Sequence, residues 1–272
     1  MTHLLAVGYG FSARAVAQRL IPLGWCVSGT GRRERVQDGV TVSNIAHAFD
    51  RAVTHILVSV PPNEDGDETL NAWRDQLHAL PDLQWVGYLS TVGVYGDHQG
   101  AWVDEETPLI SLNARSKWRA VAELQWLSFA AKRRVSGQIF RLAGIYGPGR
   151  SPLDRVRDGR AQRVIKPGQV FNRIHVTDIA AAILAGIERP NAGPIFNVTD
   201  DEPAPPQDVI AYAVEKLGLS PLPDVPFEQA ELSPMARSFY RDNKRVRNTR
   251  IKNELGVALC YPNYRVGIDS LS

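Results

Sequence analysis

The sequence predicts an α/β fold, a doubly wound parallel sheet with a smaller C-terminal α/β lobe. Apolar runs alternate with helix-like stretches through residues 1–147, and a glycine-rich turn joins the first run to the first helical stretch. After residue 147, frequent prolines divide the chain into shorter elements. Continuous apolar strands between helices are typical of a parallel sheet covered on both faces. Ligands bind such sheets at the carboxyl ends of the strands, so the site is expected there.

In the first half, each element follows from its own pattern. Apolar runs predict strands at 3–8, 25–30, 40–45, 54–60, 83–91 and within 136–147. Helical patterns predict helices at 11–24, 67–80 and 113–133, and Pro81 follows the second of them. The first helix has apolar residues near helical spacing at Phe11, Ala15, Val16, Leu20 and Leu23, and Gly24 is its expected stop.

The second half predicts shorter elements. A helix is expected at 208–218 and a short final helix at 248–256, each ended by a glycine. We expect a dinucleotide-binding domain over 1–147 and a smaller substrate-binding lobe over 148–272 that is partly interleaved with the sheet.

Composition narrows the function. A net charge of +2 without a long basic run argues against a nucleic-acid or membrane-surface protein. No apolar run approaches the roughly 20 residues of a membrane span, and residues 1–10 do not resemble a signal peptide. Cys26 and Cys260 have no metal-ligand spacing and are expected to be reduced packing residues in a cytoplasmic protein. No metal site is expected.

The turn "VGYGFSA" places Gly8, Gly10 and Ala13 in the spacing G-x-G-x-x-A between a strand and a helix. Gly8 permits the tight turn, Gly10 lets a pyrophosphate approach the backbone, and Ala13 lets helix and strand pack closely. Phe11 and Ser12 begin the helix, whose free N–H groups favour phosphate. The pattern indicates a Rossmann-type dinucleotide site. The alternatives are a tight turn without ligand or a site for another nucleotide such as S-adenosylmethionine.

The end of the second strand indicates the coenzyme. An NAD-binding protein would usually place an acid there for the ribose 2′-OH, but this segment reads "GTGRRER". Arg32 and Arg33 suit a 2′-phosphate, so NADP(H) is predicted over NAD(H). The alternative is a surface loop that happens to be basic.

Several segments together resemble the atypical extended short-chain dehydrogenase/reductase family, which is NAD(P)-dependent epimerase/dehydratase-like. The segments span most of the chain: "YLSTVGVYGD" (88–97), "DEETP" (104–108), "RLAGIYGPGR" (141–150), "NRIHVTDIAAAI" (172–183) and "GPIFNVTDDEP" (193–203). The coenzyme turn is one residue shorter than the usual G-x-x-G-x-x-G, which is similar to the family's atypical members.

The resemblance implies roles for matching residues. Thr91 matches the serine or threonine that hydrogen-bonds a substrate oxygen, although it could instead cap the strand end. The segment Ser59, Val60 and Pro61 is similar to the one that lines the dinucleotide. Tyr146 lies in the loop expected beside the nicotinamide, and Tyr95 and Tyr146 are either proton donors or packed aromatics. His175 and Asp178 are expected to tie the lobe to the sheet.

The resemblance also shows what this chain lacks. Alignment on Glu123 puts Arg115 and Arg119 where the family has the tyrosine and lysine of its catalytic Y-x-x-x-K. Arg119 could hold ribose hydroxyls as a fixed cation. Arg115 cannot donate a proton near neutral pH, but it could bind an anionic group. The alternative is a solvated helix face with an i, i+4 pair from Arg119 to Glu123.

Two functions therefore remain open. The first is an NADP(H)-dependent reductase, epimerase or dehydratase of a small polar substrate, anionic or similar to a nucleotide sugar. The second is a non-catalytic NADP(H)-binding redox sensor or interaction protein, and a methyltransferase-like use of the turn is a weaker third. The resemblance allows a homodimer through the long helix, with Trp126 expected to be exposed. The basic residues of segment 241–250 either contact a substrate diphosphate or are solvated: Arg241, Lys244, Arg245 and Arg247.

Overall fold

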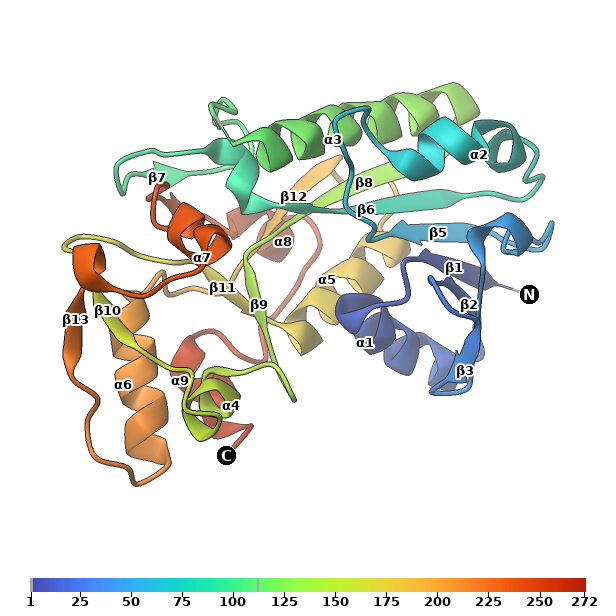
Figure 1. Cartoon of the computed structure of the whole chain (residues 1–272). Helices are drawn as coiled ribbons and strands as arrows, with labels where there is room; N and C mark the ends of the chain where they lie inside the picture. The colour runs from blue at the N-terminus through green and yellow to red at the C-terminus, as the bar shows by residue number, and fades with distance from the viewer. Residues whose placement is uncertain (1, 112) are drawn as a thin grey trace.

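A computed structural model describes residues 2–111 and 113–272, and its centre is a sheet of eight strands (Figure 1). The strand order is β12-β8-β6-β5-β1-β2-β4-β3, and every neighbouring pair is parallel except β3 with β4. The strands are β1 (His3–Val7), β2 (Cys26–Thr30), β3 (Arg35–Gln37), β4 (Val40–Ser43), β5 (His55–Val58), β6 (Trp85–Thr91), β8 (Ser136–Leu142) and β12 (Ile195–Val198). The predicted fold class is confirmed.

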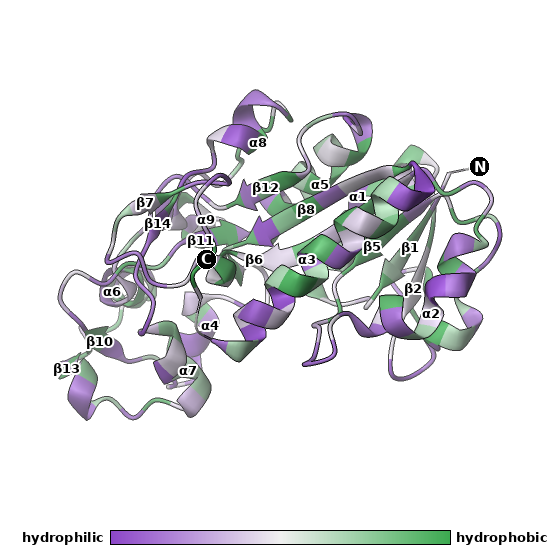
Figure 2. Cartoon of the chain, turned by 90° about the horizontal axis from the view of Figure 1, so that it is seen from above, coloured by the Kyte–Doolittle hydropathy of each residue, from purple (hydrophilic) through white to green (hydrophobic). Residues whose placement is uncertain are grey.

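Helices cover both faces of this sheet (Figure 1): α1 (Phe11–Leu20) and α5 (Val176–Glu188) on one face, α2 (Glu68–His78) and α3 (Ala114–Arg133) on the other. Alternate residues of β1 explain why both faces need cover. Leu4 and Ala6 pack with the α1 and α5 side, and Leu5 and Val7 pack with the α2 and α3 side. Figure 2 shows the resulting contrast, with hydrophobic central strands and hydrophilic ends on α3.

The rest of the chain forms the smaller lobe and short connecting elements. A separate apolar cluster joins α4 (Pro152–Arg157), α6 (Pro206–Lys216) and α9 (Tyr264–Asp269) beside the paired strands β10 (Arg163–Ile165) and β13 (Asp224–Pro226). The other elements are η1 (Ile21–Leu23), η2 (Ile45–His47), η3 (Val92–Tyr95), β7 (Trp102–Val103), β9 (Gly144–Tyr146), β11 (Arg173–His175), η4 (Phe227–Gln229), α7 (Pro234–Phe239), β14 (Arg245–Val246) and α8 (Thr249–Asn253).

Two predicted helix ends are wrong. The helix expected over 11–24 ends at Leu20 and continues as the 3₁₀ turn η1, because Pro22 has no N–H to donate to the preceding turn. Leu23 therefore lies outside the helix and is largely exposed. The helix expected to be the last one is α8, but α9 follows it and packs in the lobe.

The predicted exposure of Trp126 is also wrong. Trp126 is 1% exposed and packs edge-on against Phe129 in the core under α3. It follows Ala122 by four residues on the same inward face of the helix, so it cannot also face solvent. The exposed apolar residues of α3 are Val121 and Leu124.

The two halves of the chain share the central sheet. β12 and α5 come from residues after 148, yet β12 pairs with β8 and α5 packs against α1. The boundary at 147/148 stays a prediction, since part of the expected lobe belongs to the sheet and its covering layer.

Candidate coenzyme and substrate site

The glycine turn between β1 and α1 is shaped for close approach. Gly8 has φ +88°, and a Cβ there would lie 2.7 Å from Ser59 Oγ and 2.9 Å from Val60 Cγ2. A side chain at this position would be strained and would collide with the end of β5. Ser59 and Val60 thus pack against the turn, whereas Pro61 is exposed beyond them, and the coenzyme contact expected for this segment stays a prediction.

Space is left open at Gly10, directly before the first residue of α1. A Cβ on Gly10 would have no neighbour nearer than the Gly8 carbonyl oxygen at 4.0 Å. Gly10 is the N-cap of α1 and has no side chain to accept from the first N–H groups, which belong to Phe11 and Ser12. Ala13 is buried against the sheet. A small anion can therefore reach the backbone donors of this helix start.

Hydrogen bonds hold the turn on both sides. Ser59 Oγ donates to the Gly8 carbonyl at 2.5 Å, from the β5 side. Thr30, the last residue of β2, accepts from Gly8 N through Oγ1 at 2.9 Å and from Tyr9 N through its carbonyl at 2.8 Å. Sequence reasoning missed Thr30, although its place at the end of the second strand was a usable signal.

The end of β2 carries more arginines than the predicted pair. Arg32 and Arg33 are exposed directly after the strand. Arg35 folds back so that Nη2 donates to the Tyr9 carbonyl at 3.2 Å and Nη1 to the Arg33 carbonyl at 3.2 Å. Arg35 therefore ties the basic loop to the glycine turn, a role that spacing alone did not reveal.

Two hydroxyl groups, those of Thr91 and Ser116, lie near Gly93 just after the carboxyl end of β6. Thr91 Oγ1 accepts from Gly93 N at 3.0 Å, which caps the strand end and leaves its proton free to donate. A Cβ built on Gly93 would lie 3.1 Å from Ser116 Oγ and 3.3 Å from Thr91 Oγ1. Ser116, near the start of α3, was missed in the sequence, although its helical spacing to Glu123 was a signal.

Arg115 and Arg119 of α3 have different surroundings. Arg119 lies against the sheet, where its Nη1 donates to the Leu89 carbonyl and, at 3.4 Å, to the Tyr88 hydroxyl. Its guanidinium also lies 5.6 Å from the centre of the Tyr88 ring. Arg115 is exposed on the first turn of the helix. Tyr88 is fully buried, and burial raises the pKa of its hydroxyl, so it does not replace the missing tyrosine as a proton donor.

Glu123 binds a different partner from the one considered in the sequence. Arg141 Nη2 lies 2.7 Å from Glu123 Oε2, and Arg141 Nε donates to Oε1 at 3.1 Å. Ser90 Oγ also donates to Glu123 at 2.5 Å. The i, i+4 pair from Arg119 to Glu123 is therefore wrong, because the carboxylate is turned inward to β6 and β8.

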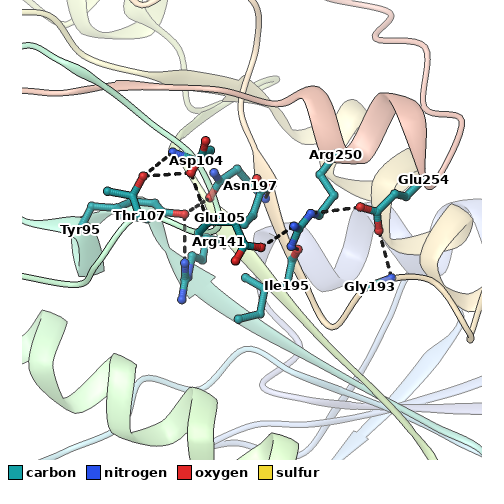
Figure 3. Close-up of polar contacts among 11 residues, drawn as sticks. Tyr95, Asp104, Glu105, Thr107, Arg141, Gly193, Ile195, Asn197, Arg250 and Glu254 are labelled. Carbon is teal, nitrogen blue, oxygen red and sulfur yellow. Dashed lines mark hydrogen bonds and ion pairs between the residues drawn. The ribbon is translucent and has the colours of Figure 1, made fainter.

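The same buried network holds Tyr95 (Figure 3). Its hydroxyl accepts from Arg141 Nη1 at 2.9 Å and donates to Asn197 Oδ1 at 2.7 Å. The side chain is fully buried, and burial raises the pKa of Tyr95 to about 12. This placement supports the packed-aromatic interpretation over the proton donor. Asn197 also donates its backbone N–H to Glu105 Oε1 at 2.7 Å, which extends the network to the loop after β7.

Tyr146 packs into the lobe. A Cβ on Gly267 of α9 would lie 1.9 Å from its hydroxyl oxygen, so ring and helix are in close contact. Within the described residues this hydroxyl has no hydrogen-bond partner, and burial raises its pKa. The loop that follows covers the start of α1, where the Arg150 guanidinium lies 5.8 Å from the Phe11 ring centre. Tyr146 thus positions this loop, and its burial argues against proton transfer.

The remaining predicted residues have structural partners. Asp178 accepts from the backbone N–H groups of Cys260 and Tyr261 at 2.8 and 3.0 Å, which ties α5 to the C-terminal segment as expected. Lys244 is buried and its Nζ donates to the Gly96 carbonyl at 2.7 Å, so the solvated interpretation is wrong for this residue. Arg245 donates to the Gly100 carbonyl, the Arg247 guanidinium lies 5.1 Å from the Trp102 ring centre, and Arg241 is exposed.

Metal-binding clusters and membrane-spanning helices are both absent from the described residues. Residues 2–111 and 113–272 contain no group of three or more His, Cys, Asp or Glu side chains that could hold a metal ion. In the same residues no helix is long and apolar enough to cross a membrane.

Comparisons with known proteins agree with this geometry, although no family model matches the chain. Protein YeeZ of Escherichia coli K12 is 27% identical over 97% of each chain. A structure of a functionally unknown conserved protein from Silicibacter pomeroyi is 50% identical, with a TM-score of 0.93 over 100% of this chain and 98% of the other. A putative NAD-dependent epimerase/dehydratase from Methylobacillus flagellatus is 26% identical, with a TM-score of 0.73 over 99% and 97%.

More distant solved structures, below 25% identity, share the fold, and several were determined with NAD or NADPH. These structural neighbours match the atypical extended short-chain dehydrogenase/reductase family, the family that the sequence motifs resemble.

Proposed function

We propose that this protein binds NADP(H) and uses it as a reductase, epimerase or dehydratase of a small polar or nucleotide-sugar-like substrate. The observation that carries the proposal is the glycine turn. Gly8 admits no side chain, Gly10 opens onto free space, and α1 begins without a side-chain cap. This combination fits a pyrophosphate on the helix N-terminus.

The residues around the turn fit the rest of the coenzyme. Phe11, Ser12 and Ala13 would supply backbone N–H groups, and Ser59 and Val60 would line the dinucleotide. Arg32 and Arg33 stand exposed at the end of β2, where a 2′-phosphate would lie, which supports NADP(H) over NAD(H). The bound nicotinamide would supply hydride transfer.

The substrate would bind at the end of β6. Thr91 and Ser116 would donate to one substrate oxygen, since both hydroxyls lie close to Gly93 after the carboxyl end of β6. Arg115, exposed beside them, would attract an anionic substrate group. Arg119 makes both of its hydrogen bonds with described residues through Nη1, which leaves its other N–H groups for the coenzyme ribose.

The proton transferred in the proposed reaction must come from a group other than the catalytic tyrosine of the family, which this chain lacks. Tyr88, Tyr95 and Tyr146 are buried, and burial raises the pKa of each. Arginine does not release a proton near neutral pH. We propose that the proton comes from water or from the substrate itself, held by the Thr91 and Ser116 hydroxyls.

The absence of that tyrosine also favours a second candidate, a non-catalytic NADP(H)-binding sensor or interaction protein. Such a protein would need the intact glycine turn but no proton donor. A partner protein would then bind with different affinity to the coenzyme-bound and the coenzyme-free forms.

A coenzyme titration followed by a turnover screen separates the two. NADPH and NADH are titrated by fluorescence, and NADPH oxidation is followed with sugar nucleotides, aldehydes and quinones. Turnover that falls at least about tenfold in Thr91→Val and Ser116→Ala, with an unchanged NADPH Kd, supports the enzyme. Ser128→Ala, on the exposed side of α3, is the matched control and should leave turnover unchanged.

Tight NADPH binding without turnover across the panel, together with NADPH-dependent capture of a partner, would support the sensor. Equal affinity for NADPH and NADH, with no loss on Arg32→Ala, would contradict the NADP(H) preference.

A further inference from the structure

An exposed arginine from the loop after β9 lies over the first residue of α1. The Arg150 guanidinium is 5.8 Å from the centre of the Phe11 ring. We propose that Arg150 binds the pyrophosphate of the coenzyme, together with the backbone N–H groups at the start of α1. This inference rests on the proposed nicotinamide coenzyme, and it gives the loop after β9 a direct part in holding both NADP(H) and NAD(H).

The loop that carries Arg150 packs against the start of α1. A Cβ on Gly147 would lie 3.3 Å from Phe11 Cζ and 2.7 Å from Val176 Cγ1, so the backbone of the loop is close to the ring. Phe11 follows Gly10, the N-cap of α1, which has no side chain to accept from the first N–H groups. The guanidinium therefore lies beside the helix start at which a pyrophosphate would bind.

The backbone on both sides of Arg150 is held in place. Arg150 donates its N–H to the Gly147 carbonyl at 3.0 Å and accepts from the Gly147 N–H at 3.1 Å, which closes a tight turn. Pro148 and Gly149 form this turn, and a glycine at φ +72° after a proline is typical of a type II turn. Ser151, the next residue, is the N-cap of α4. A side chain on such a backbone has less conformational freedom to lose when it binds a ligand.

The charge of Arg150 is available to an anion. Among the described residues no carboxylate forms an ion pair with it, whereas Arg157 of α4 lies 3.9 Å from Asp154. Asp154 is the next acid in the sequence, but its Oδ2 accepts from N and Oγ of Ser151 at 2.8 Å each. The first turn of α1 holds no acid either. A planar guanidinium suits two phosphate oxygens at once, so its fork matches a pyrophosphate.

Arg150→Ala tests this with NADPH, NADH and ADP-ribose, because all three contain the pyrophosphate. Fluorescence titration gives the Kd of the two coenzymes, and calorimetry gives that of ADP-ribose. We expect each Kd to rise by about tenfold through the loss of a charge-assisted contact. Arg150→Lys should raise each by only about threefold, since lysine keeps the charge but not the fork. Arg32→Ala, by contrast, should weaken NADPH alone.

Arg19→Ala is the matched control. Arg19 is exposed in the last turn of the same helix, about 12 Å along the axis from Phe11. It makes the same charge change beyond the screening length at physiological salt, so each Kd should change by less than about 1.5-fold. Both Arg150 variants should keep the wild-type urea midpoint, because the side chain is exposed and the turn is closed by backbone hydrogen bonds.

The Phe11 ring should orient the guanidinium through its face. Phe11→Leu is expected to raise the NADPH Kd by about threefold in the wild-type chain, and to have little further effect in Arg150→Ala. Equal effects in the two backgrounds would overturn this orienting role.

The three ligands separate the possible results. If Arg150→Ala changes none of the three Kd values, Arg150 is a solvated surface residue, and the inference is overturned while coenzyme binding stands. A loss confined to NADPH would also overturn it, because the arginine would then contact the 2′-phosphate. If the wild-type chain binds none of the three, the proposed function and this inference fail together.

Discussion

At the residue scale, Gly8 and Gly24 have similar φ values, but the two positions require glycine for different reasons. Both have positive φ, +88° and +82°, but a Cβ on Gly24 would have nothing within 4 Å. Gly24 needs only the left-handed conformation to leave the first helical segment. Gly8 needs both that conformation and the absence of a side chain against β5.

The matched pair Gly8→Ala and Gly24→Ala separates these causes. Each should lose about 1–2 kcal/mol in the free energy of unfolding from the positive φ, and Gly8→Ala should lose more through the contact with Ser59. Only Gly8→Ala should also weaken NADPH binding, by at least about tenfold, in fluorescence titration. Equal NADPH affinity in the two variants would contradict a coenzyme role for the turn.

Asp200 gives a residue-scale prediction on pH. It is 1% exposed after β12, and burial raises its pKa to about 8, although nearby Arg173 lowers it. An aspartate in the unfolded chain titrates near 4. The folded chain therefore holds a proton that the unfolded chain releases between about pH 4 and 8. The stabilisation from that proton is fully present below about pH 4 and is lost as pH rises through 8.

Replacing Asp200 with asparagine should remove this pH dependence. Urea unfolding at pH 5 and pH 8.5 should show a smaller loss of stability with rising pH in Asp200→Asn than in the wild type. Asp201→Asn, at the exposed neighbouring acid, is the control. A wild-type slope that persists in Asp200→Asn would place the titrating group elsewhere.

At the element scale, α3 shows how one helix performs different tasks on its faces. Ser116, Arg119 and Glu123 share a side turned to the sheet, Arg115 is exposed at the start, and Val121 and Leu124 point outward. The buried pair of Glu123 with Arg141 joins α3 to β8, and Ser90 joins the same carboxylate to β6. Thr91 follows Ser90 directly, so this pair also fixes the carboxyl end of β6.

Glu123→Gln should destabilise the fold by about 3–5 kcal/mol, because it leaves the Arg141 charge buried without its carboxylate. Denaturant unfolding gives the loss. Asp158→Asn is the comparison, since it breaks an exposed pair with Arg160 and should cost less than about 1 kcal/mol. Similar losses in the two variants would show that the buried pair contributes little.

At the scale of the whole molecule, the outer side of α3 exposes two neighbouring apolar side chains, Val121 and Leu124, beside α2. Leu124 is 69% exposed, and it lines a shallow groove with Val121, Gln125 and Arg74. The homodimer expected from the family resemblance would cover this face, although Trp126 takes no part in it. Apolar residues of this size are usually buried when an interface is available.

Leu124→Glu tests that assembly. Sedimentation should find a wild-type dimer and a monomeric variant, because a buried carboxylate at the interface is costly. Leu219→Glu, at a leucine 53% exposed in the lobe, should stay dimeric. A wild-type monomer at micromolar concentration would contradict the expected homodimer.

Features that depend on neighbouring residues could be predicted from the sequence, whereas contacts between segments distant in the sequence could not. Strand and helix patterns and the glycine turn are local, so spacing alone located them. The Arg115/Arg119 substitution came instead from the family resemblance. The burial of Trp126 and Lys244 depends on segments that are distant in the sequence, so sequence patterns did not predict that these side chains are buried. The Glu123 partner was misjudged for the same reason, since Arg141 lies on another element.

The sequence by itself determined the doubly wound parallel sheet and the glycine turn between its first strand and first helix, because these depend on residues a few positions apart. Only the tertiary structure decided which polar groups meet. It brought the hydroxyls of Ser116 and Thr91 close to Gly93 and buried the side chains of Tyr95 and Tyr146. It also paired the Asp38 carboxylate with the Arg14 guanidinium. Such contacts depend on how strands and helices pack in space, and a one-dimensional spacing does not contain that information.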